Sequence, residues 1–344
     1  MKKKRLLIPA ALLILALAVC IPNAGFRVVS GMVQELQRTK FSPVRTQAFA
    51  PYTPLFPTPE VENGYVPQGL CYLEQAQIYV LSAYHETQPS VLILTDAASG
   101  ARLKTLALAQ ADGQPFTGHV GGVATDGDRL YLTDGANVRR LAVSAVLQAA
   151  DGETLPLTES FLTDLRCSFL SCDGAYLYAG EFYNFTFDGS FDTDPGHWRR
   201  VSFFERYYAR CCAYPLASLD AACEAGTVTT PEYVLTLPRC VQGLARMPDG
   251  SLRLSVSYGR NNPSYLLTYA DVTAWDPDGS VLYGDEHVPI YYLYQKACTA
   301  RAELPPMLEG ITAVNGQTVG VFESCAAKYA DGAFPVDAVC SFSS

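Results

Sequence analysis

The chain has 344 residues, of which 49% are hydrophobic, and this is enough to build a sizeable folded core. Its formal net charge at pH 7 is −9, and an acidic surface repels the phosphate backbone of nucleic acids. We therefore expect no nucleic acid as a partner.

Residues 1–30 consist of a basic cluster followed by an apolar run from Leu6 to about Phe26. The run is long enough to span a bilayer as one hydrophobic helix. We predict a membrane anchor, with a cleaved signal peptide or lipidation at Cys20 as alternatives. All three place the rest of the chain outside the cytoplasm, membrane-anchored or secreted, because the positive end stays inside. We expect a monomer that contacts a membrane only through this segment.

Cysteine is frequent, with 11 in the chain. The ten that follow Cys20 are an even number, which permits disulfides outside the cell; buried free thiols are the alternative. No CxxC pair or Cys/His spacing typical of zinc ligands is present, so we predict neither a metal site nor a cofactor.

After the leader, short runs rich in Val, Leu, Tyr and Thr are separated by Gly, Asp, Asn and Pro, which is typical of strands and turns. The runs recur as five units, and each unit begins with a strand that leads into a hairpin turn. Units of about 50 to 70 residues with up to four strands are the signature of a β-propeller. We predict an all-β fold, a β-propeller of five blades, with six blades as the alternative.

The outer strands complete the ring. The segment PIYYLY at 289–294 is expected to be the outer strand of the fourth unit, and the fifth unit is one strand short. Residues 45–56 can supply this missing strand and close the ring, which hides exposed sheet edges. The predicted organisation is an anchor or signal peptide at 1–30, a linker and ring-closing strand at 31–60, and a propeller domain at 61–344.

Three stretches carry a family resemblance: VQGLARMPDGSLRLSVSYGR at 241–260, GHVGGVA at 118–124, and PPMLEGI at 305–311 with VFESCAAKY at 321–329. Together they resemble the motifs of a family of secreted or membrane-anchored bacterial β-propeller proteins of uncharacterised activity. The resemblance covers roughly residues 60 to 330, and Leu308 departs from the small polar residue expected there. It implies the propeller fold and an extracytoplasmic location, but no reaction.

Chain direction predicts which end of the ring carries a site. In an antiparallel blade, the start of the first strand and the end of the second lie on the same face. Polar and aromatic side chains occupy these positions, and we predict that they surround the mouth of the central channel. At the first-strand starts they are Gln68, His119, Gln242 and Glu309, and at the second-strand ends they are Tyr84, His85, Asp134, Glu181, Tyr183, Tyr258, Arg260 and Glu323.

An insertion at 184–207 leaves the end of a second strand and is expected to arch over this mouth. It is rich in aromatic residues, which can wall a pocket or pack on one another. These residues are Phe185, Phe187, Phe191, Trp198, Phe203 and Phe204.

Each candidate residue also has a structural interpretation. Glycines at the first-strand starts are best explained by close packing near the axis. The two glutamines can tie neighbouring blades, His119 can be a hydrogen-bonded core histidine, and Asp134 can be a turn residue. Glu309 and Glu323 need compensation if they are buried, and Arg260 and Lys328 are candidates for a structural ion pair with them.

Three functions stay open. The first is an extracytoplasmic ligand-binding propeller that holds a glycan or peptide at the channel mouth. The second is a carbohydrate-active enzyme, a glycoside hydrolase or lyase, with Glu309 and Glu323 as catalytic carboxyls and His119 as an assisting base; their separation would distinguish retention at about 5–5.5 Å from inversion at about 6.5–9.5 Å. The third is a scaffold for another envelope protein, which an exposed apolar rim would favour.

Overall fold

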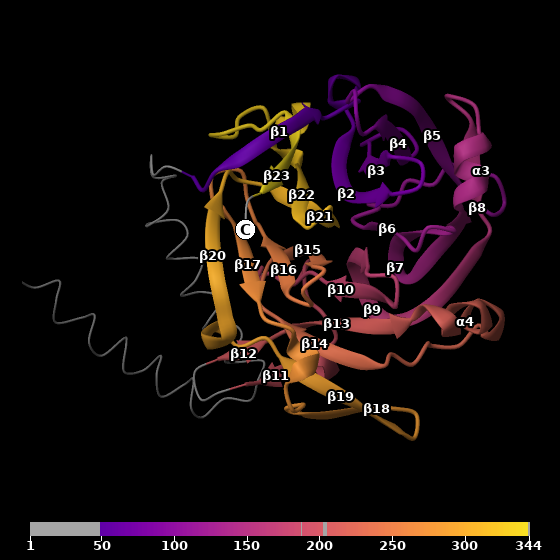
Figure 1. The fold of residues 1–344 in the computed structure, drawn as a ribbon. Coiled ribbons are helices and arrows are strands. Elements are labelled where there is room, and N and C mark those ends of the chain that lie inside the picture. Colours follow the sequence, from indigo (N-terminus) through magenta and orange to yellow (C-terminus); the bar gives the residue numbers. More distant parts are fainter. Residues whose placement is uncertain (1–48, 187, 202–204, 343–344) are drawn as a thin grey trace, which may run out of the picture.

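The computed structural model describes residues 49–186, 188–201 and 205–342. Its mainly antiparallel sheets are arranged around a common centre (Figure 1), so the predicted all-β propeller fold is confirmed. The predicted hydrophobic helix within residues 1–30 lies outside the described residues. Within the described ranges, no helix is both long and apolar enough to cross a membrane.

The first sheet has five strands, and its outermost strand pairs in parallel with its neighbour. The inner strands are buried on both faces, since they consist mainly of Val, Leu, Ile and Ala. From the axis outward, the strands are β2 (Val66–Leu73), β3 (Ile78–Tyr84), β4 (Val91–Asp96), β5 (Arg102–Gln110) and β8 (Thr154–Leu157).

The second and third predicted units share one eight-stranded sheet. The long strand β9 (Glu159–Cys172) joins them, because its first part pairs with β7 and its last part pairs with β10. The other strands, in sheet order on either side of β9, are β6 (Val123–Thr125) and β7 (Arg129–Ala142), then β10 (Tyr176–Glu181), β13 (Ala209–Pro215), β14 (Tyr233–Leu237), β19 (Glu286–Tyr292) and β18 (Gly279–Tyr283).

Two further sheets have four strands each, and short elements connect the strands. The first of these sheets contains β15 (Val241–Arg246), β16 (Leu252–Val256), β17 (Ser264–Tyr269) and β20 (Cys298–Leu304), and the second contains β21 (Leu308–Val314), β22 (Gln317–Phe322), β23 (Ala338–Phe342) and β1 (Tyr52–Pro57). The connecting elements include helices α3 (Val143–Gln148) and α4 (Leu219–Ala225), and the small pair β11 (Arg199–Arg200) and β12 (Arg206–Tyr207).

The N-terminal strand closes the ring as predicted. β1 pairs antiparallel with β23, from Tyr52 opposite Phe342 to Pro57 opposite Ala338. This pairing joins the start of the described chain to its end and covers the edge of the last sheet.

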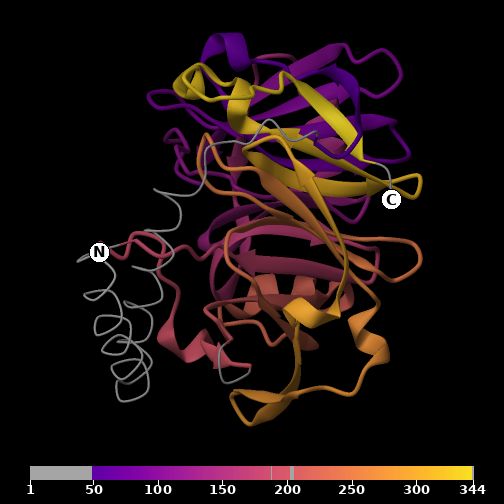
Figure 2. The same ribbon diagram turned by 90° about the vertical axis from the view of Figure 1, so that its left-hand side faces the viewer.

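One strand assignment from the sequence is wrong. The segment at 289–294 does not belong to the fourth unit, because β19 pairs in parallel with β14 of the preceding sheet. β20 takes the outer position of the fourth sheet beside β17 instead. The β18–β19 hairpin consequently extends beyond the other sheets, at the bottom of Figure 2.

The strands nearest the axis contact one another in the cyclic order β2, β6, β9, β15, β21 and again β2. This is the order that the five repeated units predict, and the blade count itself stays a prediction. Glycine permits the close approach, because a Cβ atom on Gly69 would lie 2.5 Å from the backbone nitrogen of Val123. Equivalent clashes at Gly122, Gly243 and Gly310 bear out the packing interpretation of these glycines.

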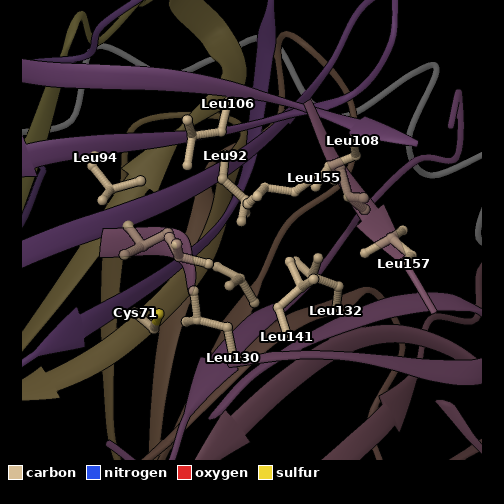
Figure 3. Packing of buried hydrophobic residues seen from close by; sticks show 14 of the residues in the cluster. Cys71, Leu92, Leu94, Leu106, Leu108, Leu130, Leu132, Leu141, Leu155 and Leu157 are labelled. Carbon is tan, nitrogen blue, oxygen red and sulfur yellow. The ribbon is translucent and has the colours of Figure 1, made fainter. Parts of the chain in front are cut away.

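Hydrophobic clusters pack adjacent sheets against one another. Figure 3 shows one cluster, in which leucines of β4 and β5 pack against leucines of β7. Leu92, Leu94 and Leu106 have no solvent exposure, nor do Leu130 and Leu132.

Candidate functional site

A cavity of about 640 Å³ opens at one mouth of the central channel. It lies where first strands begin and second strands end, which is the face that the sequence predicts. Eight of the twelve predicted site residues line it: Gln68, His119, Asp134, Gln242, Tyr258, Arg260, Glu309 and Glu323.

A β-bulge recurs in three of the innermost strands, and each bulge orients one of these side chains toward the cavity. The pairing register shifts between Pro67 and Leu70 in β2, between Val241 and Gly243 in β15, and between Leu308 and Ile311 in β21. Such β-bulges re-aim side chains and are frequent beside functional sites. Each shift contains one of the polar residues Gln68, Gln242 and Glu309, which line the cavity.

Glu309 and Glu323 contact each other through a hydrogen bond between their carboxyl groups. Gln242 Nε2 donates to Glu309 Oε1 at 3.0 Å, and Gln68 Nε2 donates to Glu323 Oε2 at 3.0 Å. Burial raises the pKa of Glu309 well above its ordinary value, and the charge of Glu323 and their hydrogen bond add to this effect. Burial also raises the pKa of Glu323. The raised pKa of Glu309 favours its protonated form, so its carboxyl can donate its proton to the carboxylate of Glu323.

This contact is closer than either glycosidase arrangement. Retaining enzymes separate their carboxyls by about 5–5.5 Å and inverting enzymes by about 6.5–9.5 Å, whereas Glu309 and Glu323 are hydrogen-bonded to each other. The pair instead has the geometry of two acids that cannot both be ionised at short range. The structure thus gives the pair a proton to donate and a carboxylate to accept one, but no room between them for a glycosidic bond.

The prediction that Arg260 and Lys328 form an ion pair with the two glutamates is wrong, although the charge of Lys328 still acts to lower the pKa of Glu323. Arg260 pairs with Asp331, and its guanidinium lies over the ring of Tyr329 at 5.1 Å. Lys328 pairs with Glu86 at 3.4 Å. The amide groups of the two glutamines and the shared proton stabilise the buried carboxyls instead.

A chain of hydroxyl groups leads away from the carboxyl pair. The side chain of Tyr329 hydrogen-bonds to Glu323, and its hydroxyl lies 3.3 Å from that of Tyr84. Lys328 Nζ donates to the Tyr84 hydroxyl at 3.1 Å. The pair is therefore connected to a cation through two tyrosines, which is a route for hydrogen-bond polarisation.

His119 stands at the cavity wall with its ring centroid 4.5 Å from that of Tyr84. Desolvation by the surrounding residues lowers the pKa of His119, and the charge of Lys328 adds to this effect. Part of the His119 side chain is nevertheless exposed to solvent. We expect a neutral imidazole at pH 7, which can accept or donate one hydrogen bond.

Four predicted site residues do not line the cavity: Tyr84, His85, Glu181 and Tyr183. Tyr84 lies behind His119, and His85 Nδ1 accepts a hydrogen bond from the backbone of Thr87 at 3.0 Å, which stabilises the local turn. Tyr183 is buried and its ring stacks on that of Tyr208 at 4.7 Å.

Glu181 is only 1% exposed and belongs to a buried network. Its Oε1 lies 2.9 Å from His197 Nδ1, and its Oε2 accepts from the backbone nitrogen of Arg210 at 3.2 Å. His197 comes from the insertion at 184–207, so this contact fixes the insertion to the end of β10. A register shift between Gly180 and Glu181 explains the wrong prediction, because a bulge reverses which side chains face the channel.

An aromatic group forms another wall of the cavity: Phe182, Phe191 and Tyr258. Their ring centroids are 5.3 Å apart for Phe182 and Phe191, 6.2 Å for Phe182 and Tyr258, and 5.9 Å for Phe191 and Tyr258. We call these three residues the aromatic wall. Only Tyr258 was among the predicted ligand contacts, while Phe191 was expected as an aromatic of the insertion.

The rest of the insertion packs on the protein. Phe185 is buried, and Trp198 packs edge-on against Tyr208 with ring centroids 5.4 Å apart. Phe187, Phe203 and Phe204 lie outside the described residues. Among the described aromatics of the insertion, Phe191 lines the cavity, so the segment supplies both packing and cavity wall.

Two cavity residues have a backbone conformation that L-amino acids rarely adopt. Val120 has a φ of 44° directly after His119, and Met307 has a φ of 68° two residues before Glu309. Such strain, most unusual for the β-branched Val120, clusters at functional sites. Nothing in the residue types predicts it, since neither residue is glycine or asparagine.

The described part of the chain has no group of three or more His, Cys, Asp or Glu that could hold a metal ion. The ten cysteines that it contains are free, and Cys71, Cys167, Cys211, Cys212, Cys240 and Cys340 are buried. Of the two alternatives for the cysteines, free thiols are therefore observed.

No protein-family model and no curated protein matches the chain. Among solved structures, it is similar to the PQQ-bound aldose sugar dehydrogenase of Streptomyces coelicolor, with 15% identity, a TM-score of 0.45, and coverage of 84% of this chain and 95% of that one. It is also similar to Myxococcus xanthus glutaminyl cyclase, with 10% identity, a TM-score of 0.42, and coverage of 85% of this chain and 94% of that one. A third similar structure is Kuenenia stuttgartiensis hydrazine synthase, with 8% identity, a TM-score of 0.37, and coverage of 81% of this chain and 58% of that one. This chain therefore spans less than two thirds of that protein. These similarities concern the fold alone.

Proposed function

We propose that the protein binds a polar ligand of sugar size in the cavity at the mouth of the propeller channel. One observation carries the proposal: the aromatic wall and the hydrogen-bonded carboxyl pair line the same cavity of about 640 Å³. Ligand pockets are typically about 300–1,000 Å³ and combine apolar surface with a few convergent polar groups.

The wall and the polar groups have separate roles in this proposal. A sugar ring stacks its apolar face on Tyr258 and its neighbours Phe182 and Phe191, and its hydroxyls hydrogen-bond to the carboxyl pair and to His119. A glycan fits better than a peptide, because flat aromatic surface matches a pyranose face. The peptide is the alternative ligand.

The proposed location of the protein is supported by the sequence of the N-terminal segment. We propose that the propeller is extracytoplasmic, either membrane-anchored or secreted, as the basic and apolar pattern of residues 1–30 predicts. The motif resemblance to secreted or anchored bacterial propellers points to the same location. The ligand would then be a glycan of the envelope or of the surroundings.

Substitution of the aromatic wall tests binding directly. The domain is screened on a glycan array, and the dissociation constant of the best glycan is measured by calorimetry for the wild type and for Tyr258→Ala. We expect affinity to fall about tenfold, because the variant loses one stacking contact. Tyr265→Ala is the matched control, since Tyr265 lies on β17 outside the cavity and is also half-buried.

Two results would overturn the glycan proposal. One is a glycan array without any binder while a peptide array gives a Tyr258-dependent binder. The other is a glycan whose affinity falls equally in Tyr258→Ala and Tyr265→Ala.

An enzyme is the second candidate, and the shared proton of Glu309 and Glu323 favours it. Such a pair can act as general acid and general base on one bound molecule. Glu323→Gln should then abolish proton transfer to or from a bound sugar, and with it product formation, even when the sugar saturates the cavity. Unchanged product formation by this variant would exclude the pair as the catalytic groups.

A scaffold is less favoured. The large apolar side chains that are exposed among the described residues are Leu55, Leu103, Val228 and Leu282. They lie in β1, β5, a loop and β18, and therefore do not identify an apolar rim.

A further inference from the structure

Arg166 is a cavity residue that the sequence does not single out. It lies in β9, its side chain is exposed, and it lines the cavity beside Cys167 and Ser168. Its NH1 donates to the backbone carbonyl of Ser190 at 2.8 Å. Because Ser190 precedes Phe191, this hydrogen bond positions the guanidinium next to the aromatic wall.

The other arginines near this mouth are each neutralised by an acid. Asp134 Oδ2 accepts from both Nε and NH2 of Arg139 at 2.8 Å, and Arg260 pairs with Asp331. Asp134 lies on the strand beside Arg166, because the next residue, Gly135, pairs with Cys167 across the sheet. The carboxylate of Asp134 nevertheless binds Arg139. Among the ion pairs of the described residues, none includes Arg166.

The cavity therefore presents one guanidinium whose charge no described side chain balances, in a chain whose net charge is −9. A guanidinium offers paired donors in a planar fork that matches a carboxylate. The donors not used by Ser190 stay available to a ligand in the cavity. The carboxyl pair, by contrast, would repel a second anion near it.

We infer that Arg166 forms a carboxylate-binding subsite beside the aromatic wall, and that the ligand of this cavity is an acidic sugar. The sugar ring stacks on Phe191 and Tyr258, its carboxylate binds the guanidinium, and its hydroxyls point to the carboxyl pair. This inference rests on the proposed function, and it narrows the ligand to a uronic acid or a similar glycan acid.

Matched sugars test the inference. Oligosaccharide arrays provide glucuronate- and galacturonate-containing glycans beside the neutral glucose and galactose glycans, which differ at C6 alone. Dissociation constants of the best matched pair are then measured at low and at high salt. We expect the acidic member to bind about tenfold more tightly, and high salt to reduce this preference.

Substitution of Arg166 separates charge from packing. In Arg166→Gln, we expect the acidic sugar to lose its advantage while the affinity for the neutral sugar stays the same. Arg166→Lys should retain part of the preference, because it keeps the charge without the fork. Arg301→Gln is the matched control; Arg301 is exposed on β20, lies over Tyr265 outside the cavity, and its loss changes the net charge equally.

The outcomes are distinguishable. Equal affinities for the acidic and neutral sugars, or an equal loss of both in Arg166→Gln, overturn the subsite and leave the proposed function in place. Binding of neither class of sugar overturns the proposed function together with the subsite. If no acidic sugar binds, and a peptide with a free carboxyl terminus binds in an Arg166-dependent way, the acidic-sugar ligand is contradicted. The carboxylate that Arg166 binds is then that of a peptide.

Discussion

At the residue scale, the carboxyl pair of Glu309 and Glu323 is the most unusual feature of the molecule. Glu309 is only 3% exposed, and an isolated buried carboxylate would be costly to desolvate. The glutamine amides and the shared proton remove most of this cost. The pair therefore ties the stability of the fold to the protonation state of the cavity.

We predict that Glu309→Gln flattens the dependence of stability on pH. The folded wild type holds a proton that the unfolded chain releases near the ordinary pKa of 4.5, so its free energy of unfolding falls as pH rises above that value. The side-chain amide introduced by the substitution can still donate to Glu323 and has no proton to lose. Denaturant unfolding at a series of pH values above 4.5 should show a smaller fall in the free energy of unfolding for the variant than for the wild type.

The control for this prediction is Glu286→Gln, which changes an exposed glutamate at the tip of the β18–β19 hairpin. This variant should follow the wild type at every pH. A Glu309→Gln variant whose stability falls with pH as steeply as that of the wild type would contradict a shared proton.

At the element scale, neighbouring residues of the first strand of a blade do two things: one places a side chain in the cavity, and the next allows close packing against the adjacent blade. In β21, the bulge turns Glu309 into the cavity, and the next residue, Gly310, lets the strand pack closely against β2. Ser255 Oγ on β16 donates to the backbone carbonyl of Glu309 at 2.7 Å and ties β21 to the preceding sheet. Site geometry and blade packing thus depend on the same few residues.

We predict that Gly310→Ala destabilises the protein by about 1–3 kcal/mol. Its Cβ would lie 2.7 Å from the carbonyl oxygen of Gln68 and 2.9 Å from the backbone nitrogen of Leu70, and backbone atoms cannot move away easily. Chemical denaturation measures the loss. Gly279→Ala on the exposed strand β18 is the control, because the nearest atom to its Cβ would be 3.7 Å away. Equal stability of the two variants would contradict tight packing at the axis.

At the scale of the whole molecule, the ring is closed by strands from opposite ends of the described chain. β1 pairs with β23, and Phe56 of β1 packs on Tyr79 of the first sheet with ring centroids 5.2 Å apart. β1 therefore joins the last sheet to the first. Without it, β23 would present an unpaired edge, which favours aggregation.

We predict that a chain beginning at Thr58 is markedly less stable than a chain beginning at Phe49. The shorter chain lacks β1 and the contacts of Phe56, whereas the longer one keeps every described strand. The melting temperature should fall by several degrees, roughly 2–4 °C for each 1 kcal/mol lost in a protein of this size or somewhat smaller. Light scattering should show association of the shorter chain alone. Identical melting temperatures would mean that ring closure contributes little.

The amino-acid sequence alone was enough to predict the all-β propeller, the closing strand and the face that carries the cavity. Those features depend on local signals: alternating runs, Gly-containing turns and chain direction in an antiparallel pair. It also identified Glu309, Glu323, Gln68 and Gln242 as residues of that face, because polar residues at the starts or ends of inner strands are unusual.

The remaining features could not be predicted from local patterns, because they depend on strand register and on contacts between distant segments. A bulge at Glu181 reversed the alternation, so Phe182 faces the cavity and Glu181 binds His197. Parallel pairing with β14 moved β19 into another sheet. The contact between Glu309 and Glu323, and the lack of an acidic partner for Arg166 among the described residues, depend on where other side chains already pair, which no local pattern encodes.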